Sequence, residues 1–137
     1  MSNAIDAQHA LIFTMVTMSG VEGHFGEREV QTIGRMVKSL PVFKGFDAGK
    51  ISLVAQECME ILREPEGLDA VLGLIAGALA PRLRETAYAL AVETAAADRA
   101  VHKEELRFLA ILRDKLGLDK LVTAAIERSA IARYQAG

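Results

Sequence analysis

Apolar residues recur at every third or fourth position through most of this 137-residue chain, which is the spacing of one face of an α-helix. No stretch alternates apolar and polar residues with β-branched side chains, so the pattern argues against a sheet. Two of the three prolines, Pro41 and Pro81, fall where one helical pattern ends or the next begins. The sequence therefore predicts an all-α fold.

The breaks between these patterns predict about seven helices joined by short turns, as in antiparallel bundles. The expected ranges are 4–19, 27–40, 48–63, 68–79, 81–97, 103–116 and 120–134. Val42, Phe43 and Phe46 in the second connection are expected to plug the core. The chain is long enough for a sizeable core, and we expect a single domain over residues 1–137.

Individual helices differ in the face that they are expected to bury. The first should bury one stripe, and the alanine-rich fifth should lie at the centre, because small residues let neighbouring backbones approach closely. The residues expected to be buried in the first are Leu11, Ile12, Met15, Val16 and Ser19, and in the sixth Leu106, Leu109, Ala110, Leu112 and Leu116. Cys58 lies on an apolar face, which favours a small buried hydrophobe over a reactive thiol.

Composition narrows the function classes. A net charge of −2 argues against nucleic-acid binding, which usually needs a basic excess. A single cysteine can form neither an internal disulfide nor a zinc pair, and it fits a reduced, cytoplasmic setting. No signal peptide is expected, and the longest uncharged apolar run, residues 70–80, is too short for the ~20 residues of a transmembrane helix.

The stretch from Glu93 to Leu116 organises the chain as a helix end, an acidic turn and a new helix. A weaker copy runs from Thr17 to Leu40, displaced by 76 positions. What the two share is a pattern: a helix end, an acid, turn residues, one apolar plug and a helix with Glu at its third position. The repeat predicts two pseudo-symmetric helical halves.

The acids of these turns are the candidate metal ligands. Asp98, Glu105 and Glu93 could gather around a hard cation in the second unit, and Glu22 and Glu29 in the first. Calcium or magnesium prefers such oxygen ligands. The sequence therefore predicts a divalent-cation site at each acidic turn, as one of two interpretations.

Helix capping is the favoured alternative for the same acids. Glu105 follows His102 by three residues, and Glu29 follows Gly26 by three, so each carboxylate can fold back onto an open amide at its helix start. Acids in a first turn also complement the helix dipole. His24 and His102 lie in or beside the turns but at unmatched repeat positions, which favours solvated histidines.

Catalytic motifs are missing from the sequence: it has no GxSxG, HExxH, P-loop or GxGxxG pattern. We therefore expect no enzyme. A metal-dependent enzyme using the paired carboxylates stays open, but only Glu57 and Glu60 supply further acids well inside the third helix. A third alternative is a bundle that binds a small apolar ligand, because Gly73 and Gly77 thin the fourth helix.

The segment AVETAAADRAVHKEELRFLAILRDKLGL, residues 91–118, resembles the tellurite-resistance TerB-like family. Asp98, Val101 and Glu105 stand where the family pattern has an acid, an apolar plug and a helical Glu. Arg99 replaces the usual Gly of the turn, and His102 replaces the usual Ser or Asp cap. The first unit keeps Gly23, Phe25 and Glu29 of the family pattern. It has Glu22 where Asp is typical.

The resemblance implies a small all-helical bacterial protein of the cytoplasm, linked to tellurite resistance and stress response. It also implies a divalent-metal role for the acidic turns and assembly with protein partners at the membrane surface. On this basis we expect a non-catalytic binding or scaffold module. A homodimer stays open.

Overall fold

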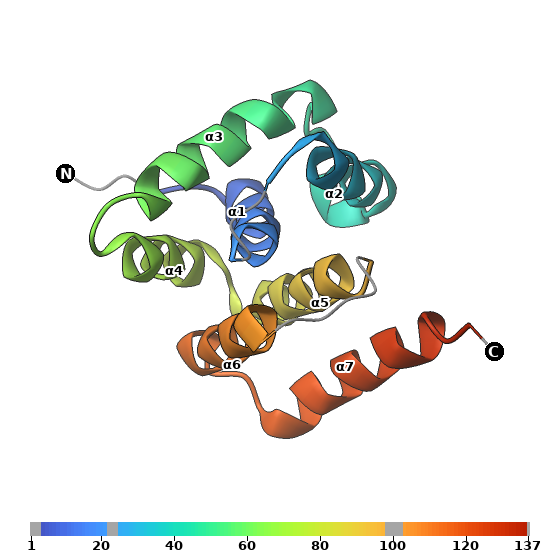
Figure 1. Ribbon diagram of the computed structural model, residues 1–137. Coiled ribbons are helices and arrows are strands. Elements are labelled where there is room, and N and C mark those ends of the chain that lie inside the picture. Colours follow the sequence, from blue (N-terminus) through green and yellow to red (C-terminus); the bar gives the residue numbers. More distant parts are fainter. Residues whose placement is uncertain (1–3, 22–24, 98–102, 137) are drawn as a thin grey trace.

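The computed structural model describes residues 4–21, 25–97 and 103–136. In these ranges the chain forms seven α-helices and no strand, which confirms the predicted all-α single-domain fold (Figure 1). The helices are α1 (Ala7–Gly20), α2 (Glu27–Ser39), α3 (Ile51–Leu62), α4 (Gly67–Ala78), α5 (Pro81–Ala97), α6 (Lys103–Leu116) and α7 (Lys120–Arg133). Two 3-10 turns, η1 (Pro41–Phe43) and η2 (Ala48–Lys50), connect α2 to α3.

Most helix ends lie within one or two residues of the predicted positions, because proline and glycine residues mark where the helices end or begin. Pro81 opens α5, where its missing amide hydrogen costs nothing. Gly117 follows α6 with a φ of 66°, a left-handed conformation that suits glycine. Phe43 is buried, and Val42 and Phe46 pack against the core as expected.

Two helix starts differ from the prediction because aspartate caps act elsewhere. Asp6 accepts a hydrogen bond from the amide of His9 at 2.8 Å, so α1 begins at Ala7. Asp47 caps the short turn η2 and not α3, accepting from the amide of Gly49 at 2.9 Å.

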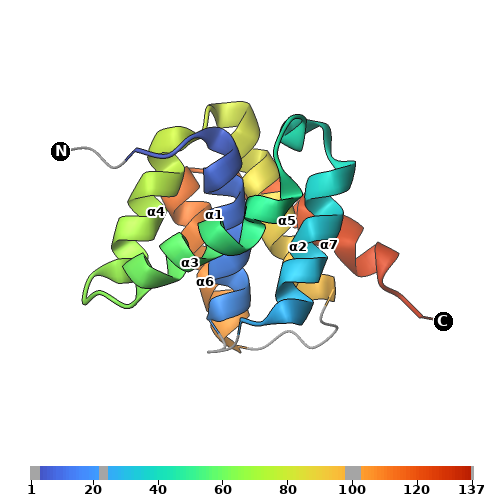
Figure 2. The same cartoon turned by 90° about the horizontal axis from the view of Figure 1, so that it is seen from above.

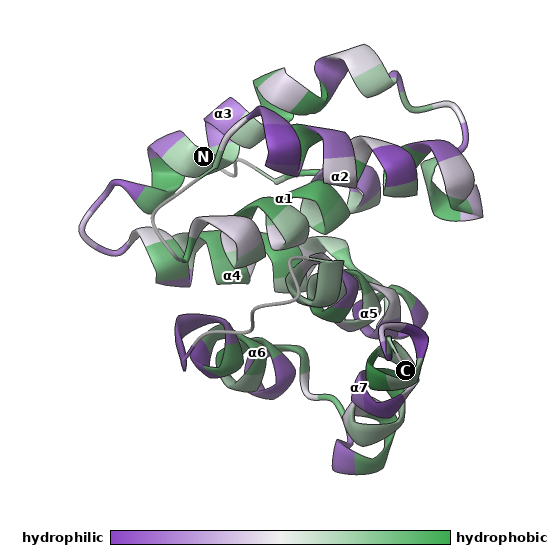
Figure 3. Ribbon diagram, turned by 45° about the vertical axis from the view of Figure 1, so that its right-hand side comes forward, coloured by the Kyte–Doolittle hydropathy of each residue, from purple (hydrophilic) through white to green (hydrophobic). Residues whose placement is uncertain are grey.

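The helix α1 is buried on every side, and this corrects the single stripe expected from its sequence. All nine residues from Ala10 to Met18 are buried. Figures 1 and 2 show α1 enclosed by its neighbours, and Figure 3 shows it apolar along its length, whereas α2 turns polar residues outward. A helix without a polar face is stable only when other helices cover it.

The most extensive helix pairing joins α1 to α5, so both lie at the centre. The face of α5 toward the core carries small residues, including Ala87, Ala91 and Ala95, and these are buried as expected. On the other sides α1 packs against α3 and α4, and α5 packs against α6 and α7. Helix α2 closes one edge. The two pseudo-symmetric halves stay a prediction.

Polar groups inside the bundle are satisfied locally. Thr14 and Thr94 donate their hydroxyl hydrogens to the carbonyl oxygens of Ala10 and Leu90, one turn earlier. In the described part of the chain, no buried side-chain nitrogen or oxygen lacks a hydrogen-bond partner.

The guanidinium of Arg84 joins three helices. It donates to the carbonyl oxygens of Ala76 at 2.9 Å and Leu79 at 3.1 Å, at the end of α4, and to that of Leu116 at 3.3 Å, at the end of α6. These carbonyls have no partner within their own helix, and a cation complements the negative end of a helix dipole.

The buried face of α6 differs in part from the prediction. Leu109, Leu112 and Leu116 are buried as expected, but Leu106 is 58% exposed, and the aromatic ring of Phe108 fills the core instead. The exposed Leu106 is available for a site on the surface.

Two glycines of α4 lie in opposite environments and yield a paired prediction. A methyl group on Gly67 would lie 2.3 Å from the carbonyl oxygen of Ile61, whereas one on Gly73 would meet nothing within 4 Å. We expect Gly67→Ala to lower the free energy of unfolding by about 1–3 kcal/mol through this overlap. Gly73→Ala should raise it by about 0.5–1 kcal/mol, because alanine loses less backbone entropy in a helix.

Urea unfolding of the two variants and the unchanged protein measures both effects. A Gly67→Ala protein as stable as the unchanged one would show that α3 and α4 are not held this close.

Candidate functional site

The predicted metal-ligating residues are only partly described by the structure. Glu22 and Asp98, the leading acids of the two turns, lie outside the described residues, as do His24 and His102. Glu29, Glu93 and Glu105 are described.

Glu29 and Glu105 both lie in the first turn of a helix. The Oε1 atom of Glu29 accepts a hydrogen bond from the amide of Gly26 at 2.8 Å, which is the contact that the capping interpretation expects. Glu105 is only 3% exposed, in the first turn of α6. Both carboxylates also complement the positive end of a helix dipole.

Glu93 on α5 contacts the C-terminal end of α7 and the residue after it. One of its carboxylate oxygens accepts from the guanidinium of Arg133, and the other accepts from the hydroxyl of Tyr134. In residues 4–21, 25–97 and 103–136, no group of three or more His, Cys, Asp or Glu residues could hold a metal ion. The cation site at the acidic turns stays a prediction.

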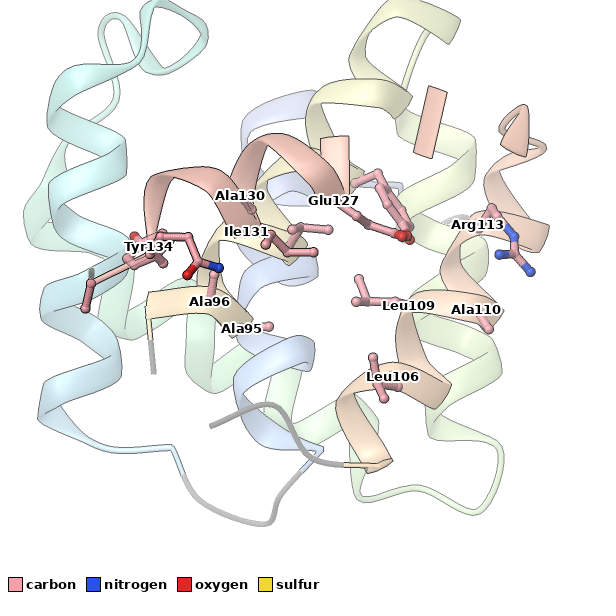
Figure 4. A pocket seen from close by; sticks show the side chains of 14 residues that line it. Ala95, Ala96, Leu106, Leu109, Ala110, Arg113, Glu127, Ala130, Ile131 and Tyr134 are labelled. Atoms are coloured by element: carbon pink, nitrogen blue, oxygen red, sulfur yellow. The ribbon is translucent and has the colours of Figure 1, made fainter. Parts of the chain in front are cut away.

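A mostly apolar groove with a volume of about 700 Å³ lies between α5, α6 and α7 (Figure 4). We call it the α5–α7 groove. Small side chains form much of its lining, and Leu106 of α6 and Ile131 of α7 reach in from different sides. The lining comprises Tyr88, Val92, Ala95, Ala96, Leu106, Leu109, Ala110, Arg113, Glu127, Ala130, Ile131, Tyr134, Gln135 and Ala136.

A tyrosine paired with a glutamate lies toward each end of the groove. The hydroxyl of Tyr88 donates to Oε2 of Glu127 at 2.5 Å, on the side where Arg113 lies. At the other end Tyr134 donates to Glu93. Each pair links α5 to α7, so the same contacts that fix the position of α7 also shape the groove.

Both tyrosines have a raised pKa, for different main reasons. Burial is the largest cause for Tyr88, followed by its hydrogen bond to Glu127. For Tyr134 the hydrogen bond to Glu93 comes first and burial second. A carboxylate that accepts from the phenol stabilises its neutral form, so neither tyrosine acts as a base near neutral pH.

Two other features carry less chemistry. A depression beside α1 and α3 gathers acids around His9, whose Nδ1 lies 2.9 Å from Oδ1 of Asp6. Glu57 and Glu60, the acids considered for an enzyme, are exposed on this depression and do not point into the bundle. Gly73 borders open space, so it does not thin α4 toward a cavity.

Cys58 behaves as the sequence predicts. It is fully buried, and burial raises the pKa of its thiol to about 11. Its Sγ lies 3.5 Å from the hydroxyl oxygen of Thr17. A thiol held neutral in the core is a poor nucleophile and a poor metal ligand.

The cation prediction can be tested directly, by calorimetric titration of the protein with calcium, magnesium, manganese and zinc. If the acidic turns bind a cation, one of these metals gives a saturable heat that Asp98→Ala abolishes. No heat with any of the four would contradict the prediction.

Titration of the two tyrosines tests the contacts that link α5 to α7. We expect both phenols to ionise above the ordinary value of 10.0. Glu93→Ala should bring the pKa of Tyr134 most of the way back to its ordinary value, because the lost hydrogen bond is the largest cause of its shift. Glu127→Ala should lower the pKa of Tyr88 only in part, because the burial of its ring remains. Tyrosinate absorbance reports both groups without interference, since the chain has no tryptophan.

The raised pKa values of the two tyrosines also determine how the stability of the protein changes at high pH. As the pH rises, a tyrosine ionises in the unfolded chain before it ionises in the folded protein. The contribution of the two phenols to the free energy of unfolding is therefore complete below pH 10 and falls as the pH rises from there through the pKa of the folded protein. Tyrosines that ionise at their ordinary pKa in the folded protein would contradict both contacts.

Comparison with known proteins agrees with the fold and with the sequence pattern. A family model described as tellurite resistance protein TerB matches residues 8–128, from the start of α1 into α7. The searches of curated proteins and of solved structures find no match. Because the matched region spans most of the sequence and both helix–turn–helix units, the chain belongs to the tellurite resistance protein TerB family.

Proposed function

We propose that this TerB-family protein is a non-catalytic binding module of tellurite resistance and stress response, and that the α5–α7 groove is its binding site. The supporting observation is that Leu106 and Ile131, 58% and 51% exposed, line one apolar hollow from two different helices. Large exposed apolar side chains that gather in one place are typical of an interaction site.

A helix of a protein partner fits this groove better than a compact ligand. The lining includes Ala95, Ala96 and Ala110, and such small side chains let a helix backbone approach closely. Leu106 and Ile131 would pack between the side chains of the incoming helix. In binding of this kind, the groove contacts apolar side chains at positions i, i+3, i+4 and i+7 of the partner helix.

The proposal also covers the cellular location of the protein and its further partners. We propose a cytoplasmic protein, which the single buried thiol of Cys58 supports. In the described part of the chain, no helix is long and apolar enough to cross a membrane. A partner at the membrane surface, and a cation at the acidic turns that tunes the fold, are compatible additions to this function.

Peptide binding tests the groove. The probe is an uncharged helical peptide with leucines at i, i+3, i+4 and i+7, labelled for fluorescence anisotropy. We expect Leu106→Ser and Ile131→Ser each to weaken its binding about tenfold, since each removes a buried apolar contact worth roughly 1.5–3 kcal/mol.

The chain offers a matched control on the same helix. Leu121 of α7 is 79% exposed but does not line the groove, so Leu121→Ser should leave binding unchanged. Equal losses in Leu106→Ser and Leu121→Ser would show that the groove is not the site. Binding of the neutral dye Nile red in place of the peptide, with loss in Leu106→Ser, would favour the small apolar ligand.

A further inference from the structure

The α6 and α7 walls of the α5–α7 groove carry more positive than negative charge, although the whole chain has a net charge of −2. One cation, Arg113, belongs to the lining. Three others each precede a lining residue by three positions, which makes them neighbours on the same helix face. They are Lys103 before Leu106, Arg107 before Ala110 and Arg128 before Ile131.

The acids of the two walls, Asp114 of α6 and Glu127 of α7, are engaged within the protein. On α5, Glu93 is paired with Arg133 and Tyr134, and Glu85, three positions before the lining residue Tyr88, is exposed. Glu127 accepts the hydrogen bond of Tyr88, and Oδ1 of Asp114 lies 3.6 Å from Nε of Arg113. By contrast, Lys103, Arg107 and Arg128 are exposed, and none forms an ion pair with another described residue. Taken together, the α6 and α7 walls therefore present four cations, Arg113, Lys103, Arg107 and Arg128, and two acids, Asp114 and Glu127.

From this asymmetry we propose that the groove takes an acidic amphipathic helix from another protein, with carboxylates on both flanks of its apolar face. The inference rests on the proposed function and names the partner's chemistry. Apolar side chains would fill the lining, while flanking Asp or Glu residues would meet Arg107 on one side and Arg128 on the other. Complementary charge of this kind raises the association rate and selects between partners.

A second copy of this chain does not present such a face. Its acidic helix α3 carries Glu57 and Glu60 but exposes only one large apolar side chain among its described residues, Leu53, whereas Val54 and Cys58 are buried in its own core, so α3 lacks a row of apolar anchors. A flat anionic membrane is also a poor fit, because the apolar lining is recessed between helices.

Three peptides with one leucine pattern and different flanks test the proposal. Each has about 16 residues, since shorter helices are marginal in water. The flanking positions carry Glu, Gln or Lys. At low salt we expect the Glu peptide to bind at least tenfold more tightly than the Gln peptide, and the Lys peptide to bind most weakly. The differences should shrink as salt screens the rim.

Charge reversal supplies the matched variants. Arg107→Glu with Arg128→Glu should abolish the preference for the Glu peptide. Lys50→Glu with Arg63→Glu makes the same change in net charge on exposed residues at the two ends of α3, and should leave the preference intact.

The outcomes separate this inference from the proposed function. If all three peptides bind equally and Leu106→Ser weakens all of them, the groove is the site but the acidic partner is wrong. If none binds, or if Leu106→Ser has no effect, the proposed function fails as well. Vesicles of anionic lipid that bind in place of the peptides, or sedimentation of the protein as a dimer blocked by Leu106→Ser, would also overturn the acidic helix.

Discussion

The enclosure of α1 is the constraint on which the rest of the structure depends. Its nine consecutive buried residues leave no side that can face water, so the remaining helices must surround it. The pairing of α1 with α5 uses the small side chains of α5 to bring the two backbones close. With this central pair in place, one group of helices covers α1 and the other covers α5, and the groove forms where the cover of α5 is incomplete.

The sequence predicts the fold well because its signals are local. Proline, glycine and helical spacing place most helix ends within one or two residues, and Cys58 is identified as buried from its apolar face. The burial of α1 on all sides does not follow from its sequence, because the threonines that interrupt its apolar run suggest a polar side and hence a single buried stripe. Both Thr14 and Thr17 are buried: the hydroxyl of Thr14 donates to a carbonyl oxygen one turn back, and that of Thr17 lies against the Cys58 sulfur, so neither needs water.

The candidate site is much harder to predict, because it depends on how helices meet. Leu106 follows the apolar spacing of α6 and yet faces the surface, since the rings and chains at Phe108 and Leu109 already fill the space toward the core. The available signal in the sequence is that the apolar face of α6 is wider than the neighbouring helices can cover, which leaves one of its residues exposed. Glu93 shows the same limit: its position in the chain associates it with the acidic turn, but its carboxylate meets partners some 40 residues later, on α7.

The attachment of α7 has a consequence for motion. Among the described residues, the side-chain hydrogen bonds that join α7 and the following Tyr134 to other helices involve Glu127, Arg133 and Tyr134, and all end on α5. We expect α1 to exchange its amide hydrogens only when the whole domain opens, and α7 to exchange through local opening while the centre stays folded. On this expectation one wall of the groove opens more readily than the core, and a bound helix would slow amide exchange in α7 far more than in α1.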